Sequence, residues 1–170
     1  RHYSEWAAAR LVRRGANAGI ARRILGVQID TVNLLTALRL LKADLEGLEP
    51  GSFWLPGGSD VGLDLFVELT ALSDVDEVLD RLKATAYGRA MDEVAVLFLE
   101  TASMAVFERA LEDLLTRRAL ALGIGDPLGV GVAVSYLWAK QNEVTNVRII
   151  ARGKAVGMPE DRMRKELILV

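Results

Sequence analysis

Few side chains in this sequence have the types and spacings that catalysis or metal binding requires. The only histidine is His2, and the 170-residue chain has no cysteine. A histidine triad, a histidine zinc site and cysteine-based disulfide, redox or metal sites are therefore excluded within it. The acidic pairs Asp76/Glu77 and Asp92/Glu93 fall in expected first turns of helices, where the helix dipole explains them. Because the serines have no nearby base, the residues alone predict a helical interaction protein rather than an enzyme.

A glycine-rich stretch, GIGDPLG at residues 123–129, is the nearest approach to a phosphate loop. It lacks the GxGxxG spacing, no Lys-Ser or Lys-Thr follows it, and no strand is expected before it. Nucleic acid is not an expected partner either, because the basic blocks are short and no aromatic-plus-basic stacking surface accompanies them. The sequence therefore predicts no cofactor, no metal site and no catalytic residue.

One polar pattern occurs twice, 113 positions apart: an acid, an asparagine three residues later and an arginine six residues after that. Its members are Asp30, Asn33 and Arg39 in the first copy and Glu143, Asn146 and Arg152 in the second. On a helix the acid and the asparagine share a face, whereas the arginine lies about 180° from the acid. The arginine is thus available to a neighbouring helix or the other repeat, and the asparagine is predicted to bond a helix end or loop backbone as a buried polar clamp. Chance similarity of two amphipathic helices is the alternative.

The elements that must position these residues are expected to be helices. Nearly every segment has apolar residues at helical spacing and no convincing alternating strand occurs, so the predicted fold class is all-α. Around the first copy we expect two helices, 16–26 and 27–47, because Gly26 and Gly47 interrupt the apolar pattern. A further helix over 4–15 is expected to precede them.

The middle of the chain predicts longer helical stretches. Asp60 and Asp74 are expected to cap helices over 60–72 and 74–85. The apolar stripe over 91–122 predicts one continuous helix roughly 45 Å long.

Around the second copy, Asp126-Pro127 is the expected start of a helix, with Asp as N-cap and Pro at the first helical position. The small residues Gly129, Gly131 and Ser135 would let another helix approach closely. The closing MPEDRMRKEL predicts a short helix with acids early and bases late.

The stretch LEPGSFWLPGGSD at residues 48–60 is the one long break in the helical pattern. It carries Phe53 and Trp54, which either tuck into the core or face a partner. Tucking is favoured, because buried aromatic side chains commonly hold loops in place.

Charge is distributed unevenly along a chain whose formal net charge is −2. Residues 1–29 hold six Arg against Glu5, residues 44–100 hold thirteen acids against three bases, and residues 140–170 hold seven bases against four acids. This asymmetry indicates either solvated helix faces, which we favour, or surfaces that face partners. No apolar run approaches the roughly 18 residues of a membrane-spanning helix.

Two stretches resemble the C subunit of the vacuolar/archaeal-type (V/A-type) rotary ATPases, the counterpart of the eukaryotic V-ATPase d subunit. IDTVNLLTALRLLKADLEGLEPGSFWLPGG looks like its acid-x-x-Asn helix with a Pro/Gly exit. DPLGVGVAVSYLWAKQNEVTNVRIIARGKAVGMPEDRMRKEL looks like its C-terminal signature, in which Glu143, Asn146 and Arg148 lie on one helix before a Gly-x-Pro turn. The resemblance spans most of residues 28–170.

The resemblance implies a funnel-shaped protein built of three helical repeats about a pseudo-threefold axis. Residues 1–90 would then be the second repeat, truncated at its start, and residues 91–170 the third. Because the chain begins with Arg1 and has about half the family's usual length, it is expected to be the C-terminal portion of a longer protein. A structural role in the repeats would then fall to seven polar residues, the six of the two copies and Arg148: Asp30, Asn33, Arg39, Glu143, Asn146, Arg148 and Arg152.

The resemblance also implies a mechanical role without an active site or a cofactor. The family's members lie on the cytoplasmic face of the membrane, on the proteolipid ring, where they receive the central shaft and pass on torque. The alternative is a free-standing helical scaffold or regulatory adaptor, for which residues 1–170 would be the complete chain and the repeats coincidental.

Overall fold

The computed structural model describes residues 15–41, 43, 47–124 and 128–169, and these are helical with no strand among them. The all-α prediction is therefore confirmed. Contacts divide the chain into two compact units, Arg1–Leu115 and Thr116–Val170. We call these the first and the second unit; the division into repeats at residue 90 stays a prediction.

Helix α2, Ala16–Leu40, is the main helix of the first unit. It runs without interruption through Gly26, so the prediction of two helices, 16–26 and 27–47, was wrong. Gly26 is buried, and a Cβ added there would lie 2.0 Å from the Ser59 hydroxyl oxygen. The glycine therefore provides a close approach between the helix and a loop rather than a helix end. The helix predicted over 4–15 lies outside the described residues.

The break after α2 contains a short 3-10 helix, η1 (Pro50–Phe53), followed by the loop that leads to α3. The prediction for the two aromatics was right for Trp54, which packs against the core and donates its indole N–H to the Val61 carbonyl at 3.1 Å. It was wrong for Phe53, which is exposed. Of the two aromatic side chains, only Trp54 thus packs against the core.

Two short helices follow, α3 (Leu63–Thr70) and α4 (Val75–Leu82). Asp74 caps α4 as predicted, because its carboxylate accepts the Glu77 backbone N–H at 2.9 Å. Asp60 does not cap α3, which begins after Gly62 instead. The backbone N–H of Asp60 instead donates to the Asp30 carboxylate.

The single helix predicted over 91–122 is wrong: the structure has three helices, α5 (Gly88–Asp92), α6 (Ala95–Thr101) and α7 (Ala105–Ala121). Ala102 adopts a left-handed conformation, with φ of 50°, and ends α6. The break rotates the apolar stripe: Leu97 is exposed, whereas Phe107 is fully buried and its ring centroid lies 4.8 Å from that of Phe98. Ring packing across the break replaces the straight helix that the periodicity predicted.

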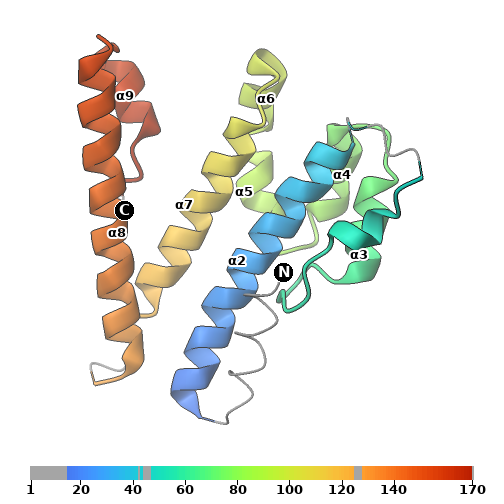
Figure 1. Cartoon of the computed structure of the whole chain (residues 1–170), viewed down its shortest axis with the longest axis horizontal. Coiled ribbons are helices and arrows are strands. Elements are labelled where there is room, and N and C mark those ends of the chain that lie inside the picture. The colour runs from blue at the N-terminus through green and yellow to red at the C-terminus, as the bar shows by residue number, and fades with distance from the viewer. Residues whose placement is uncertain (1–14, 42, 44–46, 125–127, 170) are drawn as a thin grey trace. The chain divides into compact units, whose positions relative to one another are not determined.

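The core of the first unit is formed by buried side chains of α2 and of the helices that follow it. Figure 1 shows α3 beside α2. The fully buried large side chains of this core come from almost every element, so that α2 to α7 share one core. They include Leu34, Leu38, Val61, Phe66, Leu69, Val78, Leu82, Tyr87, Met91, Phe107 and Leu111.

The second unit contains the long helix α8 (Val130–Ala155) and the short helix α9 (Glu160–Glu166), which folds back beside it (Figure 1). The predicted cap at Asp126-Pro127 lies outside the described residues; α8 begins after Gly129. Ser135 of α8 donates to the Leu120 carbonyl at 3.1 Å. Gly153 is buried at the contact between α8 and α9. A Cβ at this position would lie 2.6 Å from the sulfur of Met163, so a glycine allows the close approach. Among the described residues, no helix is long and apolar enough to cross a membrane.

Candidate functional site

The acid of the first repeat copy, Asp30, is fully buried in α2 and accepts four hydrogen bonds. Its Oδ2 accepts the backbone N–H groups of Ser59 and Asp60 at 3.0 and 2.8 Å, and its Oδ1 accepts that of Val61 at 3.0 Å. The Tyr87 hydroxyl donates to Oδ2 at 2.8 Å. A buried carboxylate with this many donors can stay in the interior, and in return it fixes the loop against the helix.

The loop approaches Asp30 this closely because residue 58 is glycine. A Cβ at Gly58 would lie 2.0 Å from Oδ1 of Asp30 and 3.4 Å from the Val61 carbonyl oxygen. The carboxylate cannot turn away without losing the N–H groups that hold it. Gly58 is therefore a requirement of the buried contact rather than a generic loop residue.

One helical turn further along α2, Asn33 bonds both polar groups of a single loop residue. Its Nδ2 donates to the Leu55 carbonyl at 2.9 Å, and its Oδ1 accepts the Leu55 N–H at 2.9 Å. The Asn33 side chain is fully buried. A side-chain amide that pairs with both groups of one residue satisfies a loop that has no helix or strand partner.

The second unit contains the same clamp. The Nδ2 of Asn146 donates to the Ile168 carbonyl at 2.9 Å, and its Oδ1 accepts the Ile168 N–H at 3.1 Å. Asn142, one turn earlier in α8, adds a second donor to the same carbonyl at 3.0 Å. The clamp here fixes the segment after α9 against α8.

The two clamps agree in spacing as well as in chemistry. Each asparagine bonds a residue 22 positions further along. Asparagine and backbone partner are both displaced by the same 113 positions, from 33 to 146 and from 55 to 168. The partner spacing is thus identical in the two copies.

The acid is the part of the pattern that differs between the copies. The side chain of Glu143 is 61% exposed and pairs with the Lys140 ammonium at 2.6 Å. The hydrogen bond and the charge of Glu143 raise the pKa of Lys140 above its usual range. The loop that binds Asp30 has no counterpart among the described residues of the second unit, where Leu169 is the last.

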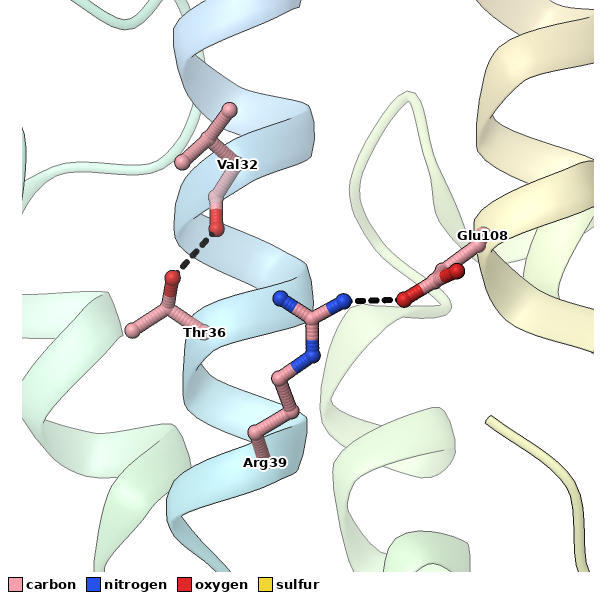
Figure 2. A network of polar contacts seen from close by, with 4 residues as sticks. All are labelled: Val32, Thr36, Arg39 and Glu108. Atoms are coloured by element: carbon pink, nitrogen blue, oxygen red, sulfur yellow. Dashed lines mark hydrogen bonds and ion pairs between the residues drawn. The ribbon is translucent and has the colours of Figure 1, made fainter. Parts of the chain in front are cut away.

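The arginines of the pattern lie on the surface. Arg39 leaves the opposite side of α2 and forms an ion pair with Glu108 of α7, while Thr36 bonds the Val32 carbonyl of its own helix (Figure 2). Arg148 and Arg152 are exposed along α8. Arg39 therefore contacts a neighbouring helix, as the sequence predicted.

Sequence reasoning missed several members of these contacts. Tyr87 lies 57 positions from Asp30 and carries no signal of its own. The backbone partners Leu55 and Ile168 had a weak signal, since both copies are followed by a Pro/Gly-containing exit. Asn142 carries no signal in the repeated pattern, although it shares the Ile168 carbonyl with Asn146.

The buried polar side chains of the pattern mainly bond backbone groups of the same chain. All four donors to Asp30 come from the protein, and each clamp asparagine bonds both polar groups of a single residue. In the part of the chain that the structure describes, no group of three or more His, Cys, Asp or Glu could hold a metal ion. In each unit, one long helix is fixed to a segment without helical structure by a side-chain amide.

Residues 2–166 match the sequence profile of the ATP synthase (C/AC39) subunit family. The chain is 35% identical to the A-type ATP synthase C subunit of Haloferax volcanii over 158 residues, which cover 92% of this chain and 44% of that protein. It is 35% identical to the corresponding A-type ATP synthase protein of Haloquadratum walsbyi over 149 residues, 86% of this chain and 42% of that one. The chain thus spans less than half the length of the curated relatives it matches.

Proposed function

Because the chain belongs to the ATP synthase (C/AC39) subunit family, we propose that it is part of a non-catalytic coupling subunit of a V/A-type rotary ATPase. In this proposal the whole protein links the central shaft to the membrane proteolipid ring. The single observation that carries it is the family match over residues 2–166.

The clamps support a role in transmitting torque. A rotor component must resist relative movement of its helices, because a flexible contact between them would reduce the torque that it transmits. In the first unit, Asp30 and Asn33 fix one face of α2 to its neighbours through six hydrogen bonds, five of them to the loop. Both side chains are fully buried, and hydrogen bonds to buried polar groups are costly to break, so the helix and loop would turn as one body.

We further infer that α2 and α8 are equivalent helices of two structural repeats, with the seven polar residues as the repeat motif. The support is the common partner spacing of the two asparagine clamps. Three such repeats about a pseudo-threefold axis would form the funnel of the whole protein, with the shaft foot inside it. The protein would then be peripheral to the membrane, on its cytoplasmic face.

Co-purification tests the coupling role directly. The full-length protein, tagged and co-expressed with the shaft and proteolipid subunits of its own complex, is expected to bring down both. Omitting the shaft subunits, and separately the proteolipid, shows which contact is direct. Recovery of neither partner overturns the coupling role and favours the free-standing adaptor.

A second measurement tests the non-catalytic part of the proposal. The purified full-length protein is expected to show no ATP hydrolysis, whereas the assembled complex hydrolyses ATP. Hydrolysis by the purified protein that survives removal of contaminating ATPases would contradict it.

A further inference from the structure

Ala102, which ends α6, has a backbone conformation that its side chain disfavours. Its φ is 50° and its ψ is 22°, in the left-handed region. Among the residues that the structure describes, the other four with positive φ are all glycine. A Cβ makes this conformation less favourable by roughly five- to thirty-fold. Other contacts in the first unit must therefore offset the strain at Ala102.

The sequence on both sides of Ala102 favours a helix that does not bend. Alanine is the strongest helix former of the natural residues. Leu97, Met104 and Leu111 recur at a spacing of seven, so a straight helix would place them on one face. In the structure Leu111 is fully buried and Met104 packs against the core, but Leu97 is 48% exposed. The bend thus takes from the core face a residue that the periodicity places there.

Phe98 provides the contact that accompanies the bend. Its side chain is 8% exposed, and its ring centroid lies 4.8 Å from that of Phe107, with an interplanar angle of 39°. The two residues are nine positions apart, so on a straight helix they would lie about 180° from each other. The ring contact and a straight helix therefore exclude each other.

The backbone hydrogen bonds at the bend do not oppose straightening. The Ala102 N–H donates to the Phe98 carbonyl at 2.7 Å, a bond that a straight helix also contains. The Val106 N–H donates to the Ser103 carbonyl at 3.2 Å, and the Ser103 N–H donates to the Thr101 hydroxyl at 3.4 Å. A straight helix would give both of these N–H groups a carbonyl acceptor four residues earlier. Straightening thus leaves the backbone donors bonded, and the burial and ring contact of Phe98 favour the bend.

We propose that Ala102 is a hinge, and that residues 95–115 exchange between the bent pair α6 and α7 and one straight helix. In the straight form Ala102 takes the right-handed helical conformation and Leu97 joins the face of Met104 and Leu111. Phe98 leaves its contact with Phe107. The hinge lies outside α2 and the loop fixed to it, and the inference goes beyond the coupling role and does not depend on it.

A distance between two spin labels tests the exchange. The chain has no cysteine, so Val96→Cys and Glu112→Cys introduce unique label sites on exposed residues of α6 and α7. The sites are 16 positions apart, which is about 24 Å along a straight helix, whereas a bend that brings Phe98 against Phe107 shortens the separation. Double electron–electron resonance on the labelled 170-residue chain is expected to show two distance populations, the longer one at the straight-helix value.

Two variants of the labelled chain should shift the populations in opposite directions. Ala102→Gly removes the left-handed strain and weakens the straight helix, so the ratio of bent to straight form is expected to rise by at least about ten-fold. Phe98→Ala removes the ring contact and should lower the same ratio by at least about ten-fold. The matched control is Ala110→Gly, inside α7, which is helical in both forms and should change the ratio by less than about two-fold.

Several outcomes overturn the hinge. One is a single distance population in the parent chain, even where a longer one appears in the Phe98→Ala variant. Others are a longer population that Ala102→Gly leaves unchanged, or one that Ala110→Gly reduces as much as Ala102→Gly does. Because no other ATPase protein takes part in the measurement, each of these leaves the coupling role standing, and failed co-purification leaves the hinge standing.

Discussion

Helices α2 and α8 carry the same asparagine clamp in opposite surroundings. Around α2 the clamp lies inside a core, and the neighbouring acid is fully buried with four donors. Around α8 the asparagine itself is only half-buried, whereas Asn33 is fully buried, and the neighbouring acid is exposed with one lysine. The comparison shows that the asparagine contact does not need the acid contact, so the two have separable functions: one fixes a chain segment, the other seals a face.

The largest difference between the units is expected at the acids. Asp30→Ala leaves three buried N–H groups and the Tyr87 hydroxyl without their acceptor, so the free energy of unfolding should fall by about 4 kcal/mol. Glu143→Ala removes only an exposed pair and should change it by less than about 0.5 kcal/mol. Urea unfolding of both variants measures this. Comparable losses would mean that Glu143 is buried in solution.

The asparagines should differ less. Asn33→Leu is expected to lower the free energy of unfolding by about 2–3 kcal/mol, because it leaves both the N–H and the carbonyl of Leu55 without this partner. Asn146→Leu should lower it by about 1–2 kcal/mol, because only the Ile168 N–H loses its partner while Asn142 still donates to the Ile168 carbonyl. Asn142→Leu should cost less than about 1 kcal/mol, because the Ile168 carbonyl keeps Asn146 as donor. Native-state hydrogen exchange assigns each loss to its own unit. Equal, small effects of Asn146→Leu and Asn142→Leu would remove the clamp interpretation.

Two close glycine contacts sharpen the comparison further. Gly58→Ala brings a Cβ against a carboxylate held by four hydrogen bonds, so we expect a loss of about 1–3 kcal/mol. Gly153→Ala brings a Cβ against the sulfur and Cγ of Met163, an unbranched side chain that can move more readily than a carboxylate held by four hydrogen bonds, so the loss should be smaller, about 1 kcal/mol. Thermal unfolding of the two variants provides the measurement. A larger loss for Gly153→Ala would show that α9 is packed as rigidly as the loop at residues 58–61.

The smallest effect is expected at the arginine of the first copy. Arg39→Gln removes the ion pair with Glu108, but both side chains are about half exposed, at 58% and 40%. Exposed pairs of this kind contribute about 0.5 kcal/mol, and salt screens them. The variant should therefore lose its small deficit relative to the parent chain at high ionic strength. A deficit that is large or insensitive to salt would give Arg39 a buried structural role.

The helical class and the two asparagines were predictable from the sequence, because helical periodicity and an acid-x-x-Asn spacing are local patterns. The position of Asp74 as a helix cap was predictable for the same reason. The helix break within residues 91–122 was not predictable from these patterns. It lies at Ala102, and it accompanies a contact between Phe98 and Phe107, which are nine positions apart. At Gly26 the sequence predicted a helix end that the structure does not have. The glycine instead allows the close contact with Ser59.

By itself, the sequence determined that the chain is helical, that one polar pattern occurs in it twice, and which family it resembles. These properties depend on the types and spacing of residues along the chain. Only the tertiary structure decided that the Asp30 side chain is buried and the Glu143 side chain is exposed. The reason is physical: burial depends on what covers a helix face, and in the first unit the cover comes from residues about 30 and 57 positions away from Asp30.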